Sequence, residues 1–401
     1  MSIKSLHEIG LLKDCTNFDL LNQVMQSKKI KFYFGIDLTA EGLHVGHLSG
    51  LMMARRLLKM GHHAIILLGG ATTKIGDPTG KDKERPIISD EIIAMNKKGI
   101  KQDVMQILSG FEESIEFVDN SDWLLNLNYI EMLNEIGRHF TLSKMLSLDS
   151  VKLRLDREQS ITFTEFNYSI IQGYDFYYLA KHKNCIMQLG GSDQWGNITS
   201  GTELARKKLS SEVFGLTIPL LVTHDGKKMG KTEGGAVWLS SKKLNDFDYF
   251  QYFRNVDDRD VKQMLLTFTD FDFKIIQELS SYSGSKINEA KEILAFEATK
   301  ICRGIDIANE CLKSAKNLYS QDNLQEDIKL EEIKSSIDDK ITHILVNNKI
   351  CSSNSDAKTL VASGAIYIND LKITDINHKF IQGAYILKVG KKRAFNLVVQ
   401  N

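Results

Sequence analysis

A strand–helix–strand pattern in residues 31–68 constrains the fold of this chain more than any other feature. The run KFYFGIDL at 31–38 predicts a buried strand, and the apolar spacing of residues 48–59 predicts a helix that ends just before Gly61. The continuous apolar run AIILL at 64–68 predicts a second strand that is covered on both faces. Strands joined in this way pair in parallel through a right-handed crossover. The pattern therefore predicts a doubly wound parallel sheet.

The remaining sequence divides into further modules. A third strand is predicted at residues 185–189, directly before two glycines. Over residues 246–330 the pattern changes to long amphipathic helices, and residues 341–401 combine a short helix with strands. A chain of 401 residues is also too long for one hydrophobic core. We therefore predict three modules.

The charges balance over the whole chain but not along it. The 51 basic and 51 acidic residues cancel, so the total names no partner. Residues 321–340 carry seven acidic and three basic side chains, whereas residues 341–401 carry eight basic and three acidic ones. This change of sign marks a module boundary, and a basic terminal module is a candidate for contact with phosphates. A solvated basic face is the alternative that charge leaves open.

Composition restricts the compartment. No apolar run reaches the roughly 20 residues of a membrane helix, and the first residues have neither a signal-peptide core nor transit-peptide character. The five cysteines are scattered without a Cys-x-x-Cys pair, which argues against a disulfide framework and against a zinc site. We therefore expect a cytoplasmic globular protein that has no membrane partner and no metal site.

The first candidate site is the motif HVGH, in the turn between the first strand and its helix. Helix N-termini offer free N–H groups to phosphate, and Gly46 lets another group approach the backbone. His44 and His47 can share one helical face and stabilise a phosphate that gains charge in a transition state. One alternative is a metal pair, although no third ligand is evident. The other is two ordinary surface histidines.

Three glycine-rich segments are further candidates. The segment GGATTKIGDPTGK at 69–81 is not a Walker A loop, because Asp82 follows where Ser or Thr must ligate magnesium. The segment GGSDQW at 190–195 suits a ribose, whose hydroxyls would donate to the aspartate. The segment KKMGKT at 227–232 predicts a mobile lysine-bearing loop between glycine hinges. Taken alone, the first of these segments is consistent with an ordinary turn, and the last with a basic surface loop.

Together these motifs resemble those of the class I aminoacyl-tRNA synthetases. HVGH and KMGKT resemble the two signatures of that class, with departures from its consensus at Val45, Gly230 and Thr232. The segments YFGIDLTAEGLHVGHL, GDPTGK, YDFYYLA, QLGGSDQWGNI and KKMGKTEGGAVWL closely resemble bacterial-type tyrosyl-tRNA synthetases, in which similar variants occur. The basic terminal segment resembles an S4-type RNA-binding domain. The resemblance covers essentially the whole chain.

The resemblance implies an α/β fold with a Rossmann-like doubly wound parallel sheet in the catalytic domain, followed by an α-helical domain and a small α+β S4-type domain. The implied catalytic domain covers residues 1–222, and a helical insertion near 110–150 forms a homodimer interface. Residues 223–330 would hold the signature lysine loop and the anticodon-side helices. The implied linker is 331–340, and the S4-type domain is 341–401.

The implied activity is that of a tyrosine–tRNA ligase, which activates L-tyrosine with ATP and transfers it to tRNA(Tyr). ATP enters as a substrate with Mg²⁺, and no cofactor is bound permanently. The attacking tyrosine carboxylate is already an anion, so catalysis requires positioning and neutralisation of phosphate charge rather than a protein base. Catalytic contacts to the phosphates are implied for Thr39, His44, His47, Lys81, Arg85, Lys228 and Lys231. Contacts to ATP are implied for Gly35, Asp37, His44, Gly46, His47, Gly191, Asp193 and Lys231.

Contacts to tyrosine are implied for Tyr33, Asp77, Tyr168, Gln172, Asp175 and Gln194. Among these, Tyr33 and Asp175 match the pair that holds the phenolic hydroxyl, and the spacing of Tyr168, Gln172 and Asp175 puts them on one helical face. A site that binds the hydroxyl can reject phenylalanine by roughly 10⁵-fold without editing. A tryptophanyl synthetase and a non-catalytic RNA-binding relative are the alternatives.

Overall fold

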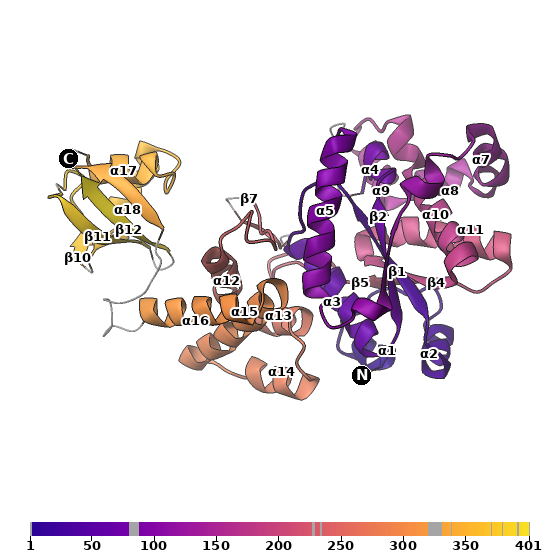
Figure 1. The fold of residues 1–401 in the computed structure, drawn as a ribbon, viewed down its shortest axis with the longest axis horizontal. Coiled ribbons are helices and arrows are strands. Elements are labelled where there is room, and N and C mark those ends of the chain that lie inside the picture. Colours follow the sequence, from indigo (N-terminus) through magenta and orange to yellow (C-terminus); the bar gives the residue numbers. More distant parts are fainter. Residues whose placement is uncertain are drawn as a thin grey trace. The chain divides into compact units, whose positions relative to one another are not determined.

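The computed structural model of the chain divides into two compact units, Met1–Leu312 and Lys313–Asn401 (Figure 1). The structure describes residues 2–79, 88–226, 229–232, 235–319, 331–337, 339–369, 371–378, 380–390 and 393–400.

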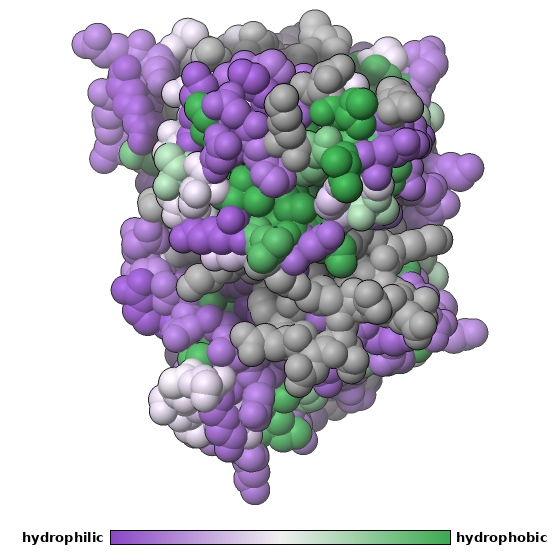
Figure 2. Space-filling model, turned by 90° about the vertical axis from the view of Figure 1, so that its left-hand side faces the viewer, coloured by the Kyte–Doolittle hydropathy of each residue, from purple (hydrophilic) through white to green (hydrophobic). Residues whose placement is uncertain are grey.

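The surface is hydrophilic over much of one face, on which a compact group of apolar side chains is also visible (Figure 2). Within the described ranges, no helix is both long and apolar enough to cross a membrane.

A five-stranded parallel sheet forms the centre of the first unit, in the order β3-β2-β1-β4-β5. This order confirms the predicted doubly wound sheet. The chain leaves β1 in one direction and later returns to its other side, so that β1 and β4 flank the switch point where such sheets bind ligands. The strands are β1 (Lys31–Asp37), β2 (His63–Gly69), β3 (Ile115–Asp119), β4 (Cys185–Gly191) and β5 (Phe214–Ile218).

Helices cover both faces of this sheet. Because right-handed crossovers run in opposite directions on the two sides of the switch point, α3 and α5 lie on one face, and α10 and α11 lie on the other (Figure 1). Gly50 allows α3 to approach β1 closely, since a Cβ there would lie 2.5 Å from Phe34 Cζ. The helices over and beside the sheet are α1 (Ile3–Glu8), α2 (Phe18–Ser27), α3 (Val45–Lys59), α4 (Thr72–Ile75), α5 (Asp90–Ile107), α6 (Ser121–Leu124), α7 (Tyr129–Glu135), α8 (Leu142–Ser147), α9 (Asp149–Asp156), α10 (Phe163–Lys183) and α11 (Trp195–Leu209).

The helical insertion predicted near 110–150 has different bounds in the structure. Residues 115–119 form β3 at the edge of the sheet, and the helices α6 to α9 then occupy the chain from Ser121 to Asp156. The prediction placed the start of the insertion too early, because β3 is short and only its last residue, Asp119, is buried.

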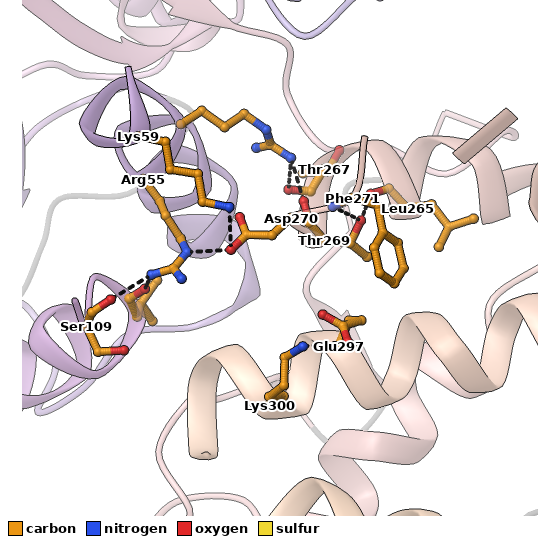
Figure 3. A network of polar contacts seen from close by, with 12 residues as sticks. Arg55, Lys59, Ser109, Leu265, Thr267, Thr269, Asp270, Phe271, Glu297 and Lys300 are labelled. Atoms are coloured by element: carbon orange, nitrogen blue, oxygen red, sulfur yellow. Dashed lines mark hydrogen bonds and ion pairs between the residues drawn. The ribbon is translucent and has the colours of Figure 1, made fainter. Parts of the chain in front are cut away.

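A helical subdomain follows the sheet, after the short strands β6 (Lys231–Thr232) and β7 (Gly235–Ala236). Arg55 and Lys59 of α3 both pair with Asp270 at 2.8 Å, which joins the subdomain to the sheet (Figure 3). The buried Arg56 adds hydrogen bonds to the carbonyl groups of Leu266, Thr267 and Thr269. Burial lowers the pKa of Arg56 to about 10, so the guanidinium remains charged at neutral pH. The helices are α12 (Asp246–Arg254), α13 (Val261–Phe268), α14 (Phe273–Ser280), α15 (Ile287–Arg303) and α16 (Ile305–Tyr319).

The second unit has its own sheet, in the order β10-β9-β11-β12-β8, and its own apolar core. Its strands are antiparallel except for β8, which pairs in parallel with β12. The elements are β8 (Glu332–Ser336), α17 (Ile341–Asn347), α18 (Asn354–Ala362), β9 (Ile366–Ile368), β10 (Leu371–Ile373), β11 (Gly383–Val389) and β12 (Arg393–Gln400).

The structure corrects the predicted linker at 331–340. Five of those residues form β8, and Ile333 is buried in the core of the second unit. The boundary between the compact units also falls earlier, after Leu312 and within α16. Charged residues dominate this stretch because β8 is an edge strand with only one buried apolar side chain.

Candidate active site

A cleft of about 350 Å³ opens at the carboxyl ends of β1 and β4, between the N-terminus of α3 and the side of α10. This is the edge at which a doubly wound sheet binds its ligands. The cleft is lined by these residues expected from the sequence: Tyr33, Gly35, Asp37, Thr39, His44, Gly46, His47, Asp77, Tyr168, Gln172, Asp175, Gly191, Asp193 and Gln194. Lys81, Arg85 and Lys228 lie outside the described residues, as does the side chain of Lys231.

The closed end of the cleft contains Tyr33 and Asp175, each 1% exposed. Asp175 Oδ2 accepts a hydrogen bond of 3.0 Å from Asn120 Nδ2, and Oδ1 accepts one of 2.8 Å from Trp123 Nε1. Burial raises the pKa of Asp175 to about 7, although these two donors favour the charged form. Burial also raises the pKa of Tyr33, and the nearby Asp175 adds to this shift.

Unsatisfied polar atoms at this end point to a polar ligand. The Tyr33 hydroxyl has no hydrogen-bond partner among the described residues, and the same holds for Gln172 Oε1 and Gln188 Oε1. A buried group left without a partner costs about 1–3 kcal/mol. A ligand that carries a hydroxyl or an amine at these positions would remove that cost.

Carboxylates surround the middle of the cleft. Asp37 accepts hydrogen bonds from Tyr168 at 3.1 Å and from Thr72 at 2.8 Å. Asp77 accepts one of 2.8 Å from Gln194 Nε2. Burial raises the pKa of Tyr168, and the negative charges of Asp37 and Asp77 raise it further. The local charge therefore favours a cationic group such as an ammonium.

The two histidines of HVGH form the mouth of the cleft at the N-terminus of α3. His44 is the N-cap residue and its Nδ1 accepts a hydrogen bond of 3.1 Å from the N–H of Gly46, while His47 Nδ1 accepts one of 3.3 Å from the N–H of His44. Both acceptors place the proton of the neutral ring on Nε2. A Cβ at Gly46 would lie 2.8 Å from His44 Cε1, so any larger residue there would displace the His44 ring. The mouth therefore combines a helix N-terminus with two imidazole donors, which suits phosphate.

Comparisons with known proteins agree with this geometry. Residues 25–320 match the family described as tRNA synthetases class I (W and Y), and residues 322–397 match the tyrosine–tRNA ligase SYY-like C-terminal domain. Tyrosine–tRNA ligases from Borrelia hermsii and Pelagibacter ubique are each 43% identical to this chain; the first match covers 100% of both chains, and the second covers 98% of this chain and 97% of the relative.

The chain belongs to the tyrosine–tRNA ligase family.

A solved structure supports the fold. The crystal structure of a C-terminally truncated mitochondrial tyrosyl-tRNA synthetase from Aspergillus nidulans aligns with a TM-score of 0.71 at 28% identity, covering 78% of this chain and 93% of that chain. The resemblance seen in the sequence and the predicted fold class are thus both confirmed.

Sequence reasoning missed several residues of this ligase cleft. Asn120, Thr72 and Gln188 line it, and Trp123 supports Asp175 from behind. Asn120 follows β3 at its carboxyl end, where functional side chains of a parallel sheet are expected. That signal would have been usable only if β3 itself had been predicted.

The described part of the ligase contains no group of three or more His, Cys, Asp or Glu residues that could hold a metal ion. The pair His44 and His47 therefore has no third ligand within these residues, and their Nδ1 atoms already accept backbone N–H groups.

Proposed function

We propose that this chain activates L-tyrosine with ATP, releases pyrophosphate and transfers the tyrosyl group from the adenylate to the 3′ end of tRNA(Tyr). Family membership supports the activity. The observation that carries the choice of amino acid is the closed end of the cleft, where the buried hydroxyl of Tyr33 faces the same space as the buried carboxylate of Asp175. A phenolic hydroxyl satisfies both groups.

The tyrosine backbone is assigned to the middle of the cleft. We assign its α-ammonium to Asp77, Tyr168 and Gln172, with Gln194 holding Asp77 by its 2.8 Å hydrogen bond. The ammonium would offset the negative charge that surrounds Tyr168. This orientation points the α-carboxylate toward the mouth of the cleft.

Activation forms a bond between the tyrosine carboxylate and the α-phosphorus of ATP, and it breaks the bond from that phosphorus to the oxygen that leaves with pyrophosphate. The nucleophile carries no proton, so no general base is required. We propose that the Nε2–H groups of His44 and His47, together with the N-terminus of α3, stabilise the negative charge that develops on the phosphates. Thr39 lines the same mouth. Further phosphate contacts are proposed on the basis of the sequence alone for Lys81, Arg85, Lys228 and Lys231.

The nucleoside of ATP is assigned to the glycine-rich ends of β1 and β4. Gly35, Asp37, Gly191 and Asp193 line this side of the cleft. Carboxylates accept hydrogen bonds from ribose hydroxyls, and glycines let the ring approach the backbone. Mg²⁺ enters with the phosphates of ATP as part of the substrate, since magnesium of this kind keeps most of its ligands from phosphate and water.

The second unit is assigned to tRNA. It folds around its own core, and residues 341–401 carry eight basic and three acidic side chains. A basic module of this kind binds the phosphates of RNA without a contribution from the cleft. We keep the S4-type assignment for residues 341–401, with β8 added to its sheet.

We also propose a homodimer formed through the helical insertion. Several of its large apolar side chains are exposed, and large exposed apolar patches mark interaction sites. They include Leu125, Tyr129, Ile130, Leu133, Leu142 and Leu146. We place the enzyme in the cytoplasm, where its five cysteines stay reduced.

Tyrosine-dependent exchange of pyrophosphate into ATP tests the activation step. The purified chain should catalyse exchange with L-tyrosine and only weakly with L-phenylalanine or L-tryptophan. An Asp175→Ala variant, which loses the partner of the phenol, should lose the exchange with tyrosine. Exchange that depends on tryptophan instead would overturn the assignment.

A further inference from the structure

Arg303 is the last residue of α15, and its side chain is only 1% exposed. Each of its three guanidinium nitrogens has a hydrogen-bond partner. Nε donates to the carbonyl oxygen of Leu239 at 3.0 Å, and Nη2 donates to that of Trp238 at 3.1 Å. Nη1 pairs with Asp246 Oδ1 at 2.7 Å. The guanidinium carbon also lies 4.1 Å from the ring centroid of the buried Tyr249, which fixes the plane of the group.

The two carbonyl groups bound by Arg303 belong to a segment that holds the entrance to α3. The N–H of Leu239 donates to the carbonyl oxygen of Leu43 at 2.8 Å, and the N–H of Val45 donates to that of Val237 at 2.9 Å. Between these bonds His44 forms a β-bridge with Trp238, and the two rings lie edge to face at 6.2 Å. The position of the His44 backbone therefore depends on residues 237–239.

A second contact fixes the same entrance. Asp103 of α5 accepts a hydrogen bond of 2.7 Å from the N–H of Leu43. Leu43 is thus held by α5 and by residues 237–239 at once, and His44 follows it directly. Of these supports, Arg303 alone reaches the entrance from the helical subdomain. A lysine cannot reproduce it, because one ammonium does not span two carbonyl groups and a carboxylate in the fixed geometry of a guanidinium fork.

We propose that Arg303 is a positioning residue for amino acid activation. By binding the carbonyl groups of Trp238 and Leu239, it holds residues 237–239 against the N-cap of α3, and it thereby sets the position of His44 at the phosphates. This inference rests on the proposed function of His44. Arg303 touches neither tyrosine nor ATP in this assignment.

The chain supplies a matched control in Arg55. Its Nε also pairs with a carboxylate, that of Asp270, and its Nη1 also donates to two carbonyl groups, those of Ile107 and Ser109 (Figure 3). Arg55→Lys thus removes the same pattern of bonds as Arg303→Lys, but at the far end of α3 from His44. Asp246→Asn is a second control, because it weakens the ion pair of Arg303 and leaves both of its carbonyl bonds in place.

The test measures three quantities in the full-length wild type and in each variant. They are the midpoint of urea unfolding, the Kd of tyrosine without ATP, and the single-turnover rate of tyrosyl-adenylate formation at saturating ATP. Arg303→Lys should slow adenylate formation by about 10-fold to 100-fold, as misplacement of a catalytic group does. The tyrosine Kd should stay within about twofold, since the closed end of the cleft is not altered. Arg55→Lys and Asp246→Asn should keep rates within about threefold of wild type.

The outcomes separate a positioning role from a structural one. A folded Arg303→Lys protein with a wild-type rate would overturn the proposal, as would an equal loss of rate in Arg55→Lys or in Asp246→Asn. An Arg303→Lys protein that loses tyrosine affinity by the same factor as rate would show general damage to the fold and would also overturn it. A wild-type protein that forms no adenylate from tyrosine would contradict the proposed function itself. Failure of the proposed function is thereby distinguished from failure of the Arg303 proposal.

Discussion

Asn120 and Asp175 are joined by a hydrogen bond of 3.0 Å, although 55 residues separate them in the sequence. The same amide nitrogen lies 3.0 Å from Thr72 Oγ1, and the Thr72 hydroxyl donates to Asp37 at 2.8 Å. One buried network therefore connects the carboxylate at the closed end of the cleft with the carboxylate in its middle. The groups assigned to the phenol and to the ATP side of the cleft are thus held by shared supports.

Specificity for tyrosine should depend on the two groups at the closed end. Tyr33→Phe and Asp175→Ala should both lower the ratio of kcat/KM for tyrosine to kcat/KM for phenylalanine. The loss should fall mainly on tyrosine, because each variant removes a partner of the phenolic hydroxyl, which phenylalanine lacks. Tyr33→Phe should cost about 0.5–1.5 kcal/mol and Asp175→Ala more, because Asp175 offers a charged acceptor.

Tyr249 provides the control for Tyr33, because it is equally buried but lies in the helical subdomain. Tyr249→Phe should leave the ratio unchanged. Equal losses for both amino acids in the Tyr33 and Asp175 variants would mean that these residues support the fold instead of selecting the substrate.

The raised pKa of Asp175 should appear in the pH dependence of stability. The carboxyl has a pKa of about 7 in the folded protein and an ordinary value of 3.8, so between about pH 4 and 7 only the folded state binds this proton. The contribution of Asp175 to the free energy of unfolding therefore falls as pH rises through that window, by at most about 1.4 kcal/mol per pH unit, and is constant above it. Asp175→Asn removes the titration.

Urea unfolding of wild type and Asp175→Asn at pH 5, 6, 7 and 8 measures this effect. The free energy of unfolding of the wild type minus that of Asp175→Asn should decrease from pH 5 to pH 7. Asp257→Asn is the control, since hydrogen bonds from Arg259 lower the pKa of Asp257 and its titration falls below the measured range. A difference for Asp175→Asn that increases with pH would contradict the assignment.

Local patterns predicted the parts of the site that lie on one element or one turn. The β1–α3–β2 unit follows from apolar runs and spacing, and Tyr168, Gln172 and Asp175 share a helix whose period brings them together. Asn120 and Trp123 were missed because their partner Asp175 lies 55 and 52 residues away in the sequence. β3, which positions Asn120, is a five-residue edge strand with little apolar signal of its own.

The second unit shows the same limit. β8 has the sequence EIKSS, in which only Ile333 is buried, so its composition is that of a linker. It is a strand because β12 pairs with it in parallel from more than sixty residues away in sequence. Long-range pairing of this kind leaves no periodic trace in a polar edge strand. The bonds of Arg303 to Trp238 and Leu239 are equally invisible to local pattern.

The histidines at the mouth should act on rate rather than on tyrosine affinity. His44→Ala and His47→Ala should each slow adenylate formation by about 10²-fold, the usual loss for one donor to a transition-state anion, with little change in the Kd of tyrosine. Pre-steady-state measurement of activation and equilibrium binding of tyrosine check this. His7→Ala, at an exposed helical position, should change neither quantity. An unchanged rate with much weaker tyrosine binding would place the histidines at the amino acid instead.

The proposed dimer should depend on the exposed apolar side chains of the insertion. Ile130 and Leu142 are 69% and 68% exposed in the isolated chain. Changing both to Asp should convert a dimer to a monomer in sedimentation at micromolar concentration, because an unpaired charge at an apolar interface is costly. Ile275→Asp, at an exposed apolar position in α14, should leave the dimer intact. A wild type that sediments as a monomer would refute the proposal.

The corrected boundary of the second unit changes how its role should be tested. A cut near residue 340 would remove β12 and leave β8 without its partner strand, whereas a cut after Tyr319 keeps α16 whole and removes the entire terminal sheet. The chain ending at Tyr319 should retain tyrosine-dependent pyrophosphate exchange, because the described residues that line the cleft lie before it.

Charging of tRNA by that truncated chain should fall steeply, since the basic module that contacts RNA phosphates is gone. In the full chain, the apparent affinity for tRNA should weaken as salt rises, because each phosphate contact releases counterions, and the slope should be shallower after truncation. Aminoacylation and exchange are measured on the same preparations. Full aminoacylation by the truncated chain would exclude an RNA-binding role for the second unit. Loss of both activities, with the far-ultraviolet circular dichroism of a folded helical protein retained, would show instead that the second unit supports the catalytic cleft.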